Sequence, residues 1–170
     1  MFTAAMTDTF TTTQSSWTQT RGVTIRKVET IPLRVPFTSA FKIAAPDSPS
    51  RQGVDVLVVR IHTSEGVVGV GETQAWRRQG SAEVLGNLGY LIRTLFEPAM
   101  VGQSPFDIAA IMTKLNALAY DSLYAQAAIG DALYDLVGKL LGVPVYTLLG
   151  GRCVDRIPVG IALSIGEEPG

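Results

Sequence analysis

Alternation of hydrophobic and polar positions marks the first folded part of the chain. Between Ile25 and Pro32 the residues alternate imperfectly, and several are β-branched, in the stretch VTIRKVETIPLRVPF that begins at Val23. This pattern predicts a strand. The following stretch, SAFKIAAPDSPSRQG, contains two prolines and ends in a glycine, so it predicts a loop over residues 39–53. Loops of that length in compact domains tend to be functional or disordered.

A second and a third strand follow directly. VDVLVVRIHT covers residues 54–63, SEG covers 64–66 and VVGVGET covers 67–73. Two strand-like runs joined by a short turn that contains Gly66 predict a β-hairpin. Together with the first strand, the hairpin predicts a three-stranded antiparallel meander.

The spacing of apolar residues then becomes helical. The first predicted helix covers residues 81–100, with Ser81 as its N-cap and Pro98 at its end. Its apolar face consists of Val84, Leu88, Leu91 and Leu95. A second helix is predicted to begin with Ser104 as N-cap and Pro105 in the first helical position, where a missing N–H costs nothing.

The third predicted helix covers residues 121–141 and is apolar over most of its surface. One face consists of Leu123, Ala127, Gly130, Tyr134, Val137 and Leu141, and it is widened by Ile129, Leu133, Leu136 and Leu140. So broad an apolar surface predicts a helix that is covered on most sides. Gly142 is placed for a left-handed C-cap, and Pro144 prevents continuation. After one short helical turn, RIPVGIALS predicts a buried strand. The whole order of elements predicts an α+β fold.

Two pairs of polar residues have spacings that suit chemistry. Asp131 and Asp135 lie four apart on one face of the third helix and could supply two metal oxygens. The favoured alternative is a solvated stripe in which Asp135 pairs with Lys139. His62 and Glu72 lie on neighbouring strands and could act as an acid–base pair. Here too an ordinary surface pair is favoured.

The glycines of EGVVGVGE do not have the G-x-G-x-x-G spacing of a phosphate-binding turn. They are predicted to permit the turn and close backbone approach within the sheet. The segment that follows, QAWRRQG, covers residues 74–80 and combines Trp76 with Arg77 and Arg78. These side chains suit an anionic or planar ligand. The alternative is a rim loop that packs its tryptophan onto the helices.

Charge and composition exclude several classes of protein. Fourteen Lys and Arg against fifteen Asp and Glu give a net charge of -1, so electrostatics favour neither a nucleic-acid nor a membrane partner. Cys153 is the single cysteine, which excludes an intrachain disulfide framework. No apolar run approaches the ~18 residues of a membrane span. Residues 1–22 lack a secretory signal and predict a disordered leader, and a cytoplasmic protein is expected.

Four stretches, taken in order, resemble the enolase superfamily, of the mandelate racemase and muconate lactonizing enzyme type. They are IRKVETIPLRVPF, VLVVRIHTSEGVVGVGET, GQSPFDI and AAIGDALYDLVGKLLGVPVYTLLGG. The last stretch is the most specific of the four. Gly130 stands where the family usually has aspartate, and Tyr134 stands where it usually has tryptophan. The resemblance extends from Val23 to the C-terminus.

The resemblance implies a capping domain over residues 23–151. The first strand of a (β/α) barrel would lie in residues 152–170, with the remainder of the barrel absent. In such enzymes a divalent metal, usually Mg²⁺, holds a substrate carboxylate while a base removes the proton α to it. The metal ligands and bases lie on the barrel, so no catalytic residue and no metal ligand is expected in this chain. The intact enzyme would be a racemase, epimerase, cycloisomerase or dehydratase, and the fragment alone is expected to be inactive.

Two loops of the family's cap close over the substrate, and they match residues 37–46 and 73–80. The resemblance points to six substrate-binding candidates on them: Phe41, Lys42, Ile43, Gln74, Trp76 and Arg77. The alternative is that these loops merely cover the barrel mouth. Expected partners are a small carboxylate substrate, a barrel domain in the same or another chain, and further copies in a homo-oligomer. The alternative function is a stand-alone, non-catalytic binding or interaction domain.

Overall fold

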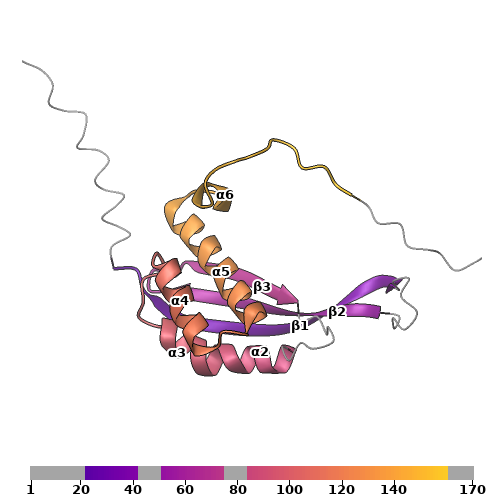
Figure 1. Cartoon of the computed structure of the whole chain (residues 1–170), viewed down its shortest axis with the longest axis horizontal. Helices are drawn as coiled ribbons and strands as arrows, with labels where there is room; N and C mark the ends of the chain where they lie inside the picture. Colours follow the sequence, from indigo (N-terminus) through magenta and orange to yellow (C-terminus); the bar gives the residue numbers. More distant parts are fainter. Residues whose placement is uncertain (1–21, 42–50, 75–83, 161–170) are drawn as a thin grey trace, which may run out of the picture.

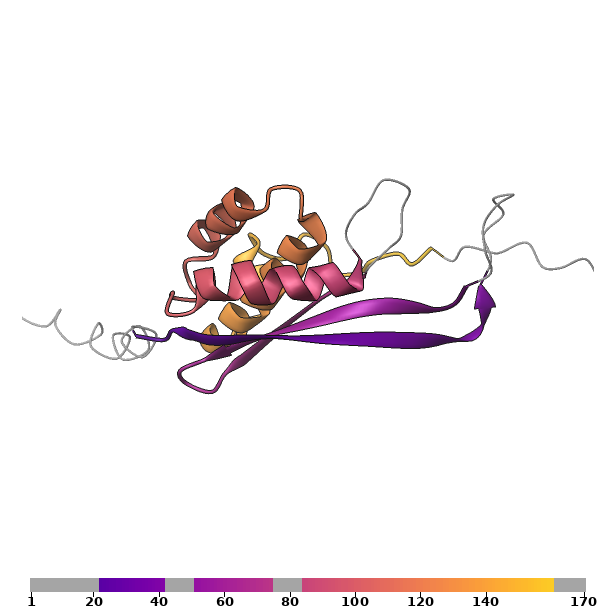
Figure 2. The same cartoon turned by 90° about the horizontal axis from the view of Figure 1, so that it is seen from below.

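The protein has two layers, a three-stranded sheet and helices on one of its faces (Figures 1 and 2). The computed structural model describes residues 22–41, 51–74 and 84–160. The strands β1 (Ile25–Phe41), β2 (Arg51–Thr63) and β3 (Val68–Gln74) follow one another in the sheet, and both pairs are antiparallel. This confirms the predicted meander. The predicted leader falls almost entirely outside the described residues.

The strands β1 and β2 are longer than predicted. The interval 39–53 was expected to be a loop, but β1 continues to Phe41 and β2 begins at Arg51. The prolines of β1 are compatible with this because β1 is an edge strand. Pro32 and Pro36 share the register of Val28, whose N–H points away from β2 toward Glu97 Oε1 at 3.1 Å. The N–H groups that these prolines lack are therefore not needed for pairing with β2.

The helices begin with one rod that runs along β1 (Figure 1). It consists of α2 (Leu85–Leu91), the π-helical turn η1 (Ile92–Phe96) and α3 (Glu97–Met100). Then come α4 (Ile108–Leu118), α5 (Leu123–Leu141) and α6 (Val145–Leu148). As predicted, α5 ends at Gly142 in the left-handed region, with φ of 67°. In the described ranges, no helix is long and apolar enough to span a bilayer.

The first helical rod corrects two predictions about its ends. Its N-cap is Val84, whose N–H donates to Asn87 Oδ1 at 2.7 Å, three residues after the predicted Ser81, which lies outside the described residues. Pro98 does not end it, because the chain stays helical to Met100. A proline inside a helix lacks an N–H and clashes with the carbonyl four residues back. The π-turn widens the rod just before Pro98, and the Glu97 N–H bonds the carbonyl of residue 92, five back.

The same π-turn changes which face of the rod is buried. The predicted apolar face included Val84 and Leu95, yet these side chains are 39% and 42% exposed. The residues fully buried against the sheet are Leu88, Ile92, Phe96 and Met100. They are spaced by four, because the wider turn keeps every fourth residue on the same side.

The predicted start of the second helix is also wrong. The helix α4 begins at Ile108 with Asp107 in the N-cap position, not at Ser104. A turn precedes it, in which the Asp107 N–H donates to the Ser104 carbonyl at 3.2 Å. The Ser104 Oγ accepts from the Phe106 N–H at 3.3 Å. Ser104 therefore caps a turn, and Pro105 lies within that turn.

The helix α5 packs on the sheet with small side chains. Its fully buried residues include Ala125, Ala128 and Ala132, alternating with larger ones such as Leu133 and Leu136. Both ends of the face predicted as principal are exposed, with Leu123 at 65% and Leu141 at 38%, whereas its member Val137 is buried. The residues predicted to widen that face are thus the ones nearest the core. Alanines allow close contact with the sheet, which the hydrophobic spacing alone did not indicate.

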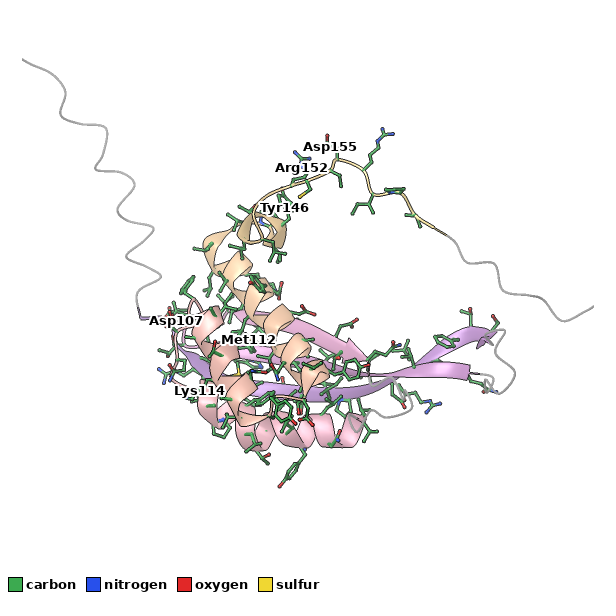
Figure 3. All side chains as sticks on the ribbon, viewed as in Figure 1. Asp107, Met112, Lys114, Tyr146, Arg152 and Asp155 are labelled. Atoms are coloured by element: carbon green, nitrogen blue, oxygen red, sulfur yellow. The ribbon has the colours of Figure 1, made fainter. Side chains whose placement is uncertain are left out.

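The last described residues leave the body of the molecule after α6 (Figure 3). The predicted strand RIPVGIALS is described only over 156–160, where the chain is neither a strand nor buried. Ile157 and Val159 are 80% and 85% exposed. A strand requires a neighbour to pair with its N–H and C=O groups, and none lies beside this segment in the described part of the chain.

Candidate functional site

The candidate site lies at the end of the sheet where β1 and β2 extend past the helices as a two-stranded ribbon (Figure 2). Phe41 is the last residue of β1 and pairs with Arg51, while Gln74 is the last residue of β3 and pairs with Val56. Five residues of β2 separate those two positions, which corresponds to about 17 Å. The structure thus brings the backbone of both candidates to the same end of the sheet.

The remaining four candidates fall outside the described residues. Lys42 and Ile43 follow Phe41, and Trp76 and Arg77 follow Gln74. Their assignment as substrate-binding residues stays a prediction.

One side of the ribbon is apolar, which the sequence analysis missed. Leu33 and Val35 lie on the sheet face opposite the helices, and they are 43% and 45% exposed. Val54 and Val56 of β2 share that face by register. Because the helices cover only the other side, this part of the ribbon is available for packing. The alternating stretch LRVPF carried the signal, since it lies inside the predicted strand, but its apolar side was not singled out as an exposed surface.

The ribbon's other side carries an ion pair. Arg34 and Asp55 are opposite each other, with Arg34 Nη1 3.5 Å from Asp55 Oδ1. Both side chains are exposed, so the pair contributes little to stability. The ribbon therefore presents an apolar side and a charged side.

The predicted His62–Glu72 pair does not form. The register places His62 opposite Val68, whereas Glu72 is opposite Val58 at the other end of β3. His62 instead meets Glu29 of β1, with 3.2 Å between Nε2 and Oε2. Arg60 Nη1 is also 3.2 Å from the same carboxylate oxygen. Sequence alone could not give this pairing, since it depends on the offset between β1 and β2.

The pKa of Glu29 is lowered, first by the hydrogen bond from His62 and then by the charges of Lys27 and Arg60, while desolvation opposes the shift. A lowered pKa in the folded state stabilises the protein above the ordinary value of 4.5, and this contribution is lost as pH falls through the lowered pKa. We expect the urea midpoint of the wild type to exceed that of Glu29→Gln at about pH 7, with the difference closing as the pH falls below 4.5. A difference that is independent of pH would contradict this coupling.

The other polar pair forms as the favoured alternative predicted. Lys139 Nζ lies 2.6 Å from Asp135 Oδ2. Asp135 also accepts a hydrogen bond from the Val70 N–H at 2.7 Å, and Lys139 donates to the Val68 carbonyl at 3.0 Å. Among the described residues, no three His, Cys, Asp or Glu side chains are grouped to hold a metal ion. This part of the chain therefore does not fit Mg²⁺.

Two glycines of β3 bring the strand against α5. A Cβ on Gly71 would lie 2.6 Å from the Ala132 backbone nitrogen, and one on Gly69 would lie 2.5 Å from Leu136 Cβ. The expected close approach is therefore between helix and sheet, and not between strands. Gly66 has φ of 77° in the hairpin turn, as its position in that turn requires. At Gly69 and Gly71, strand β3 therefore packs directly against the backbone of α5.

Comparisons with known proteins agree with this architecture. The family described as "Mandelate racemase / muconate lactonizing enzyme, N-terminal domain" matches residues 21–150. The N-succinyl-L-Arg/Lys racemase of Bacillus cereus is 34% identical over 137 residues, which are 81% of this chain and 35% of that protein. The crystal structure of N-succinyl Arg/Lys racemase from Bacillus cereus superimposes with a TM-score of 0.77 at 31% identity, over 84% of this chain and 38% of that one.

A second solved structure gives a similar match. It is the muconate lactonizing enzyme from Pseudomonas fluorescens complexed with muconolactone, with a TM-score of 0.73 at 30% identity, over 80% of this chain and 36% of that one. The chain spans about a third of the length of the curated relatives that it matches. The likeness therefore covers one domain of these proteins.

Proposed function

The chain belongs to the mandelate racemase / muconate lactonizing enzyme family, whose N-terminal domain it contains, and on this premise we propose that it caps the active site of a Mg²⁺-dependent enzyme. That enzyme would remove the proton α to the carboxylate of a small substrate. Racemases and cycloisomerases are the activities named among the relatives. The observation that carries the proposal is the projecting ribbon with the end of β3 beside it.

The ribbon and β3 suit a cap for geometric reasons. The helices and the buried part of the sheet form a packed base, and the candidate segments follow Phe41 at the tip of the ribbon and the end of β3, both at one end of the sheet (Figure 1). Segments that extend from rigid elements can exclude water from a substrate without disturbing the core. Exclusion of water strengthens the electrostatic interactions that stabilise the transition state.

The proposal assigns binding, and not catalysis, to this chain. Lys42 and Arg77 are charged in the way that recognition of a carboxylate requires. Phe41, Ile43 and Trp76 offer apolar or planar contacts, and Gln74 can donate and accept hydrogen bonds. The metal and the groups that move the proton would belong to a barrel domain, because the described residues do not form a metal site.

The helical side of the domain supports packing against such a barrel. Leu123 on α5, and Tyr146 and Leu149 near α6, are 65%, 50% and 64% exposed. These exposed apolar side chains, at the two ends of α5, would be covered by a partner domain. A barrel in the same chain, a barrel in another chain and further copies in a homo-oligomer are each compatible with this surface. A stand-alone binding domain would expose it to solvent.

Alanine at both Trp76 and Arg77 tests the proposed role in the intact enzyme. We expect KM for the carboxylate substrate to rise about tenfold or more, because a lost charge-assisted contact corresponds to ~1.5–3 kcal/mol. Steady-state kinetics over a panel of N-succinyl amino acids and muconate-like diacids would show it. Glu65→Ala, in the hairpin turn at the opposite end of the sheet, is the control and should leave KM unchanged.

The reaction itself has a separate test. Exchange of the α-proton in D₂O, followed by NMR with and without Mg²⁺, should occur with the barrel-containing protein and stop when EDTA is added. Absence of exchange on every carboxylate tested would contradict the proposed chemistry. Exchange with unchanged kinetics in the Trp76 and Arg77 variants would contradict only the assigned contacts.

A further inference from the structure

The outer edge of β3 is the place where this sheet would accept another strand. The sheet order is β1, β2, β3, so within the described part of the chain β3 has a strand neighbour on one side only. An edge strand offers unpaired N–H and C=O groups to any extended segment that arrives, including one from a second molecule. Proteins that do not associate through their sheet edges cover or block these unpaired groups.

Side chains of α5 occupy this edge. The Val70 N–H donates to Asp135 Oδ2 at 2.7 Å, and the Val68 carbonyl accepts from Lys139 Nζ at 3.0 Å. The two side chains also pair with each other at 2.6 Å. An incoming strand would need both backbone groups, because its own N–H and C=O must bond to the same row.

The ion pair by itself does not explain this arrangement. Pairs at i,i+4 on a helix surface contribute about 0.3–0.5 kcal/mol, and both side chains here are at least 32% exposed. The specific feature is that each member of the pair also bonds the backbone of the edge strand. We infer that Asp135 and Lys139 form a clamp that closes the β3 edge against strand addition by another chain.

The opposite edge shows why the clamp matters on β3. The start of β1 is paired with backbone, since the Ile25 N–H bonds the Gln103 carbonyl at 2.9 Å and the Gly102 N–H bonds the Ile25 carbonyl at 2.8 Å. Further along, Glu97 accepts from the Val28 N–H. That edge is closed partly by main chain, which no side-chain substitution removes. The β3 edge between Val68 and Val70 is closed by side chains alone.

The experiment compares the double variant Asp135→Ala/Lys139→Ala with the wild type. Amide hydrogen exchange should become about tenfold or more faster at Val70, as expected when one hydrogen bond of ~1.4 kcal/mol is lost. Sedimentation velocity over a concentration series, well below the unfolding temperature, should show association beyond that of the wild type. Leu115→Ala is the control, because it empties a fully buried site yet leaves the clamp intact.

Each outcome of this comparison either supports or contradicts the clamp. Extra association of the double variant without extra association of Leu115→Ala supports the clamp, because destabilisation alone does not then cause it. Equal association of the two variants, or none in either, overturns the inference even if the Val70 amide exchanges faster. Should the double variant fail to fold, Lys139→Ala frees only the Val68 carbonyl and carries the same comparison with Leu115→Ala.

Discussion

Replacing Gly71 with alanine is expected to destabilise the fold by about 3 kcal/mol, at the upper end of what an extra methyl costs in a packed core. The new Cβ would lie 2.6 Å from the Ala132 nitrogen and would also collide with the Ala128 carbonyl. These atoms belong to the backbone of α5, so no side-chain rotation can relieve the contact. The helix would have to move away from β3. A urea titration followed by circular dichroism would measure the loss.

The control for this substitution is Gly86→Ala in α2. A Cβ there meets no atom within 4 Å. Alanine is favoured over glycine in a helix by about 1 kcal/mol, so this variant should be as stable as the wild type or more so. If Gly71→Ala were to unfold at the same urea concentration as Gly86→Ala, the close approach of α5 to β3 would be wrong.

Truncation of Phe96 to alanine is expected to have the second large effect, a loss of about 3–5 kcal/mol. Phe96 ends the π-turn and is fully buried in the core between the rod and the sheet. Its removal leaves a cavity in addition to the lost transfer free energy. Thermal or urea unfolding would report it as a lower midpoint.

Leu95 offers a matched control from the same turn. Its side chain is 42% exposed, so Leu95→Ala should cost less than about 1 kcal/mol. The two variants together also test which face of the rod is turned toward the sheet. A larger loss for Leu95→Ala than for Phe96→Ala would show that the rod buries the face that regular helical spacing predicts.

Short-range sequence signals were sufficient to predict the β-meander and the extent of helix α5. The turn with Gly66, the β-branched runs and the Gly142 stop are each readable within a few residues. The buried face of the rod could not be predicted from such short-range signals, because the π-turn near Pro98 changes the helical period. A hydrophobic pattern interpreted with one period then selects Leu95 in place of Phe96.

Partners across the sheet were harder to predict than the strands themselves. The pairing of His62 with Glu29 depends on the register of β1 against β2, in which Lys27 is opposite His62 and Glu29 is opposite Arg60, so the contact is diagonal. A shift of one residue moves every side chain to the other face. For the candidate site, the resemblance placed Phe41 and Gln74 on two loops that close over the substrate, whereas both are strand ends.

The ribbon has a consequence for how the family can diversify. From Arg34 to Pro36 its two strands pair with each other alone, since β3 reaches only to Val56 of β2, and the helices do not extend over the tip (Figure 2). Inserting one residue pair into each strand would lengthen it by about 7 Å and keep every side chain on its own face. The reach of the tip can therefore drift during evolution while the packed base is inherited unchanged. The residues that set this reach are separate from those that pack the base.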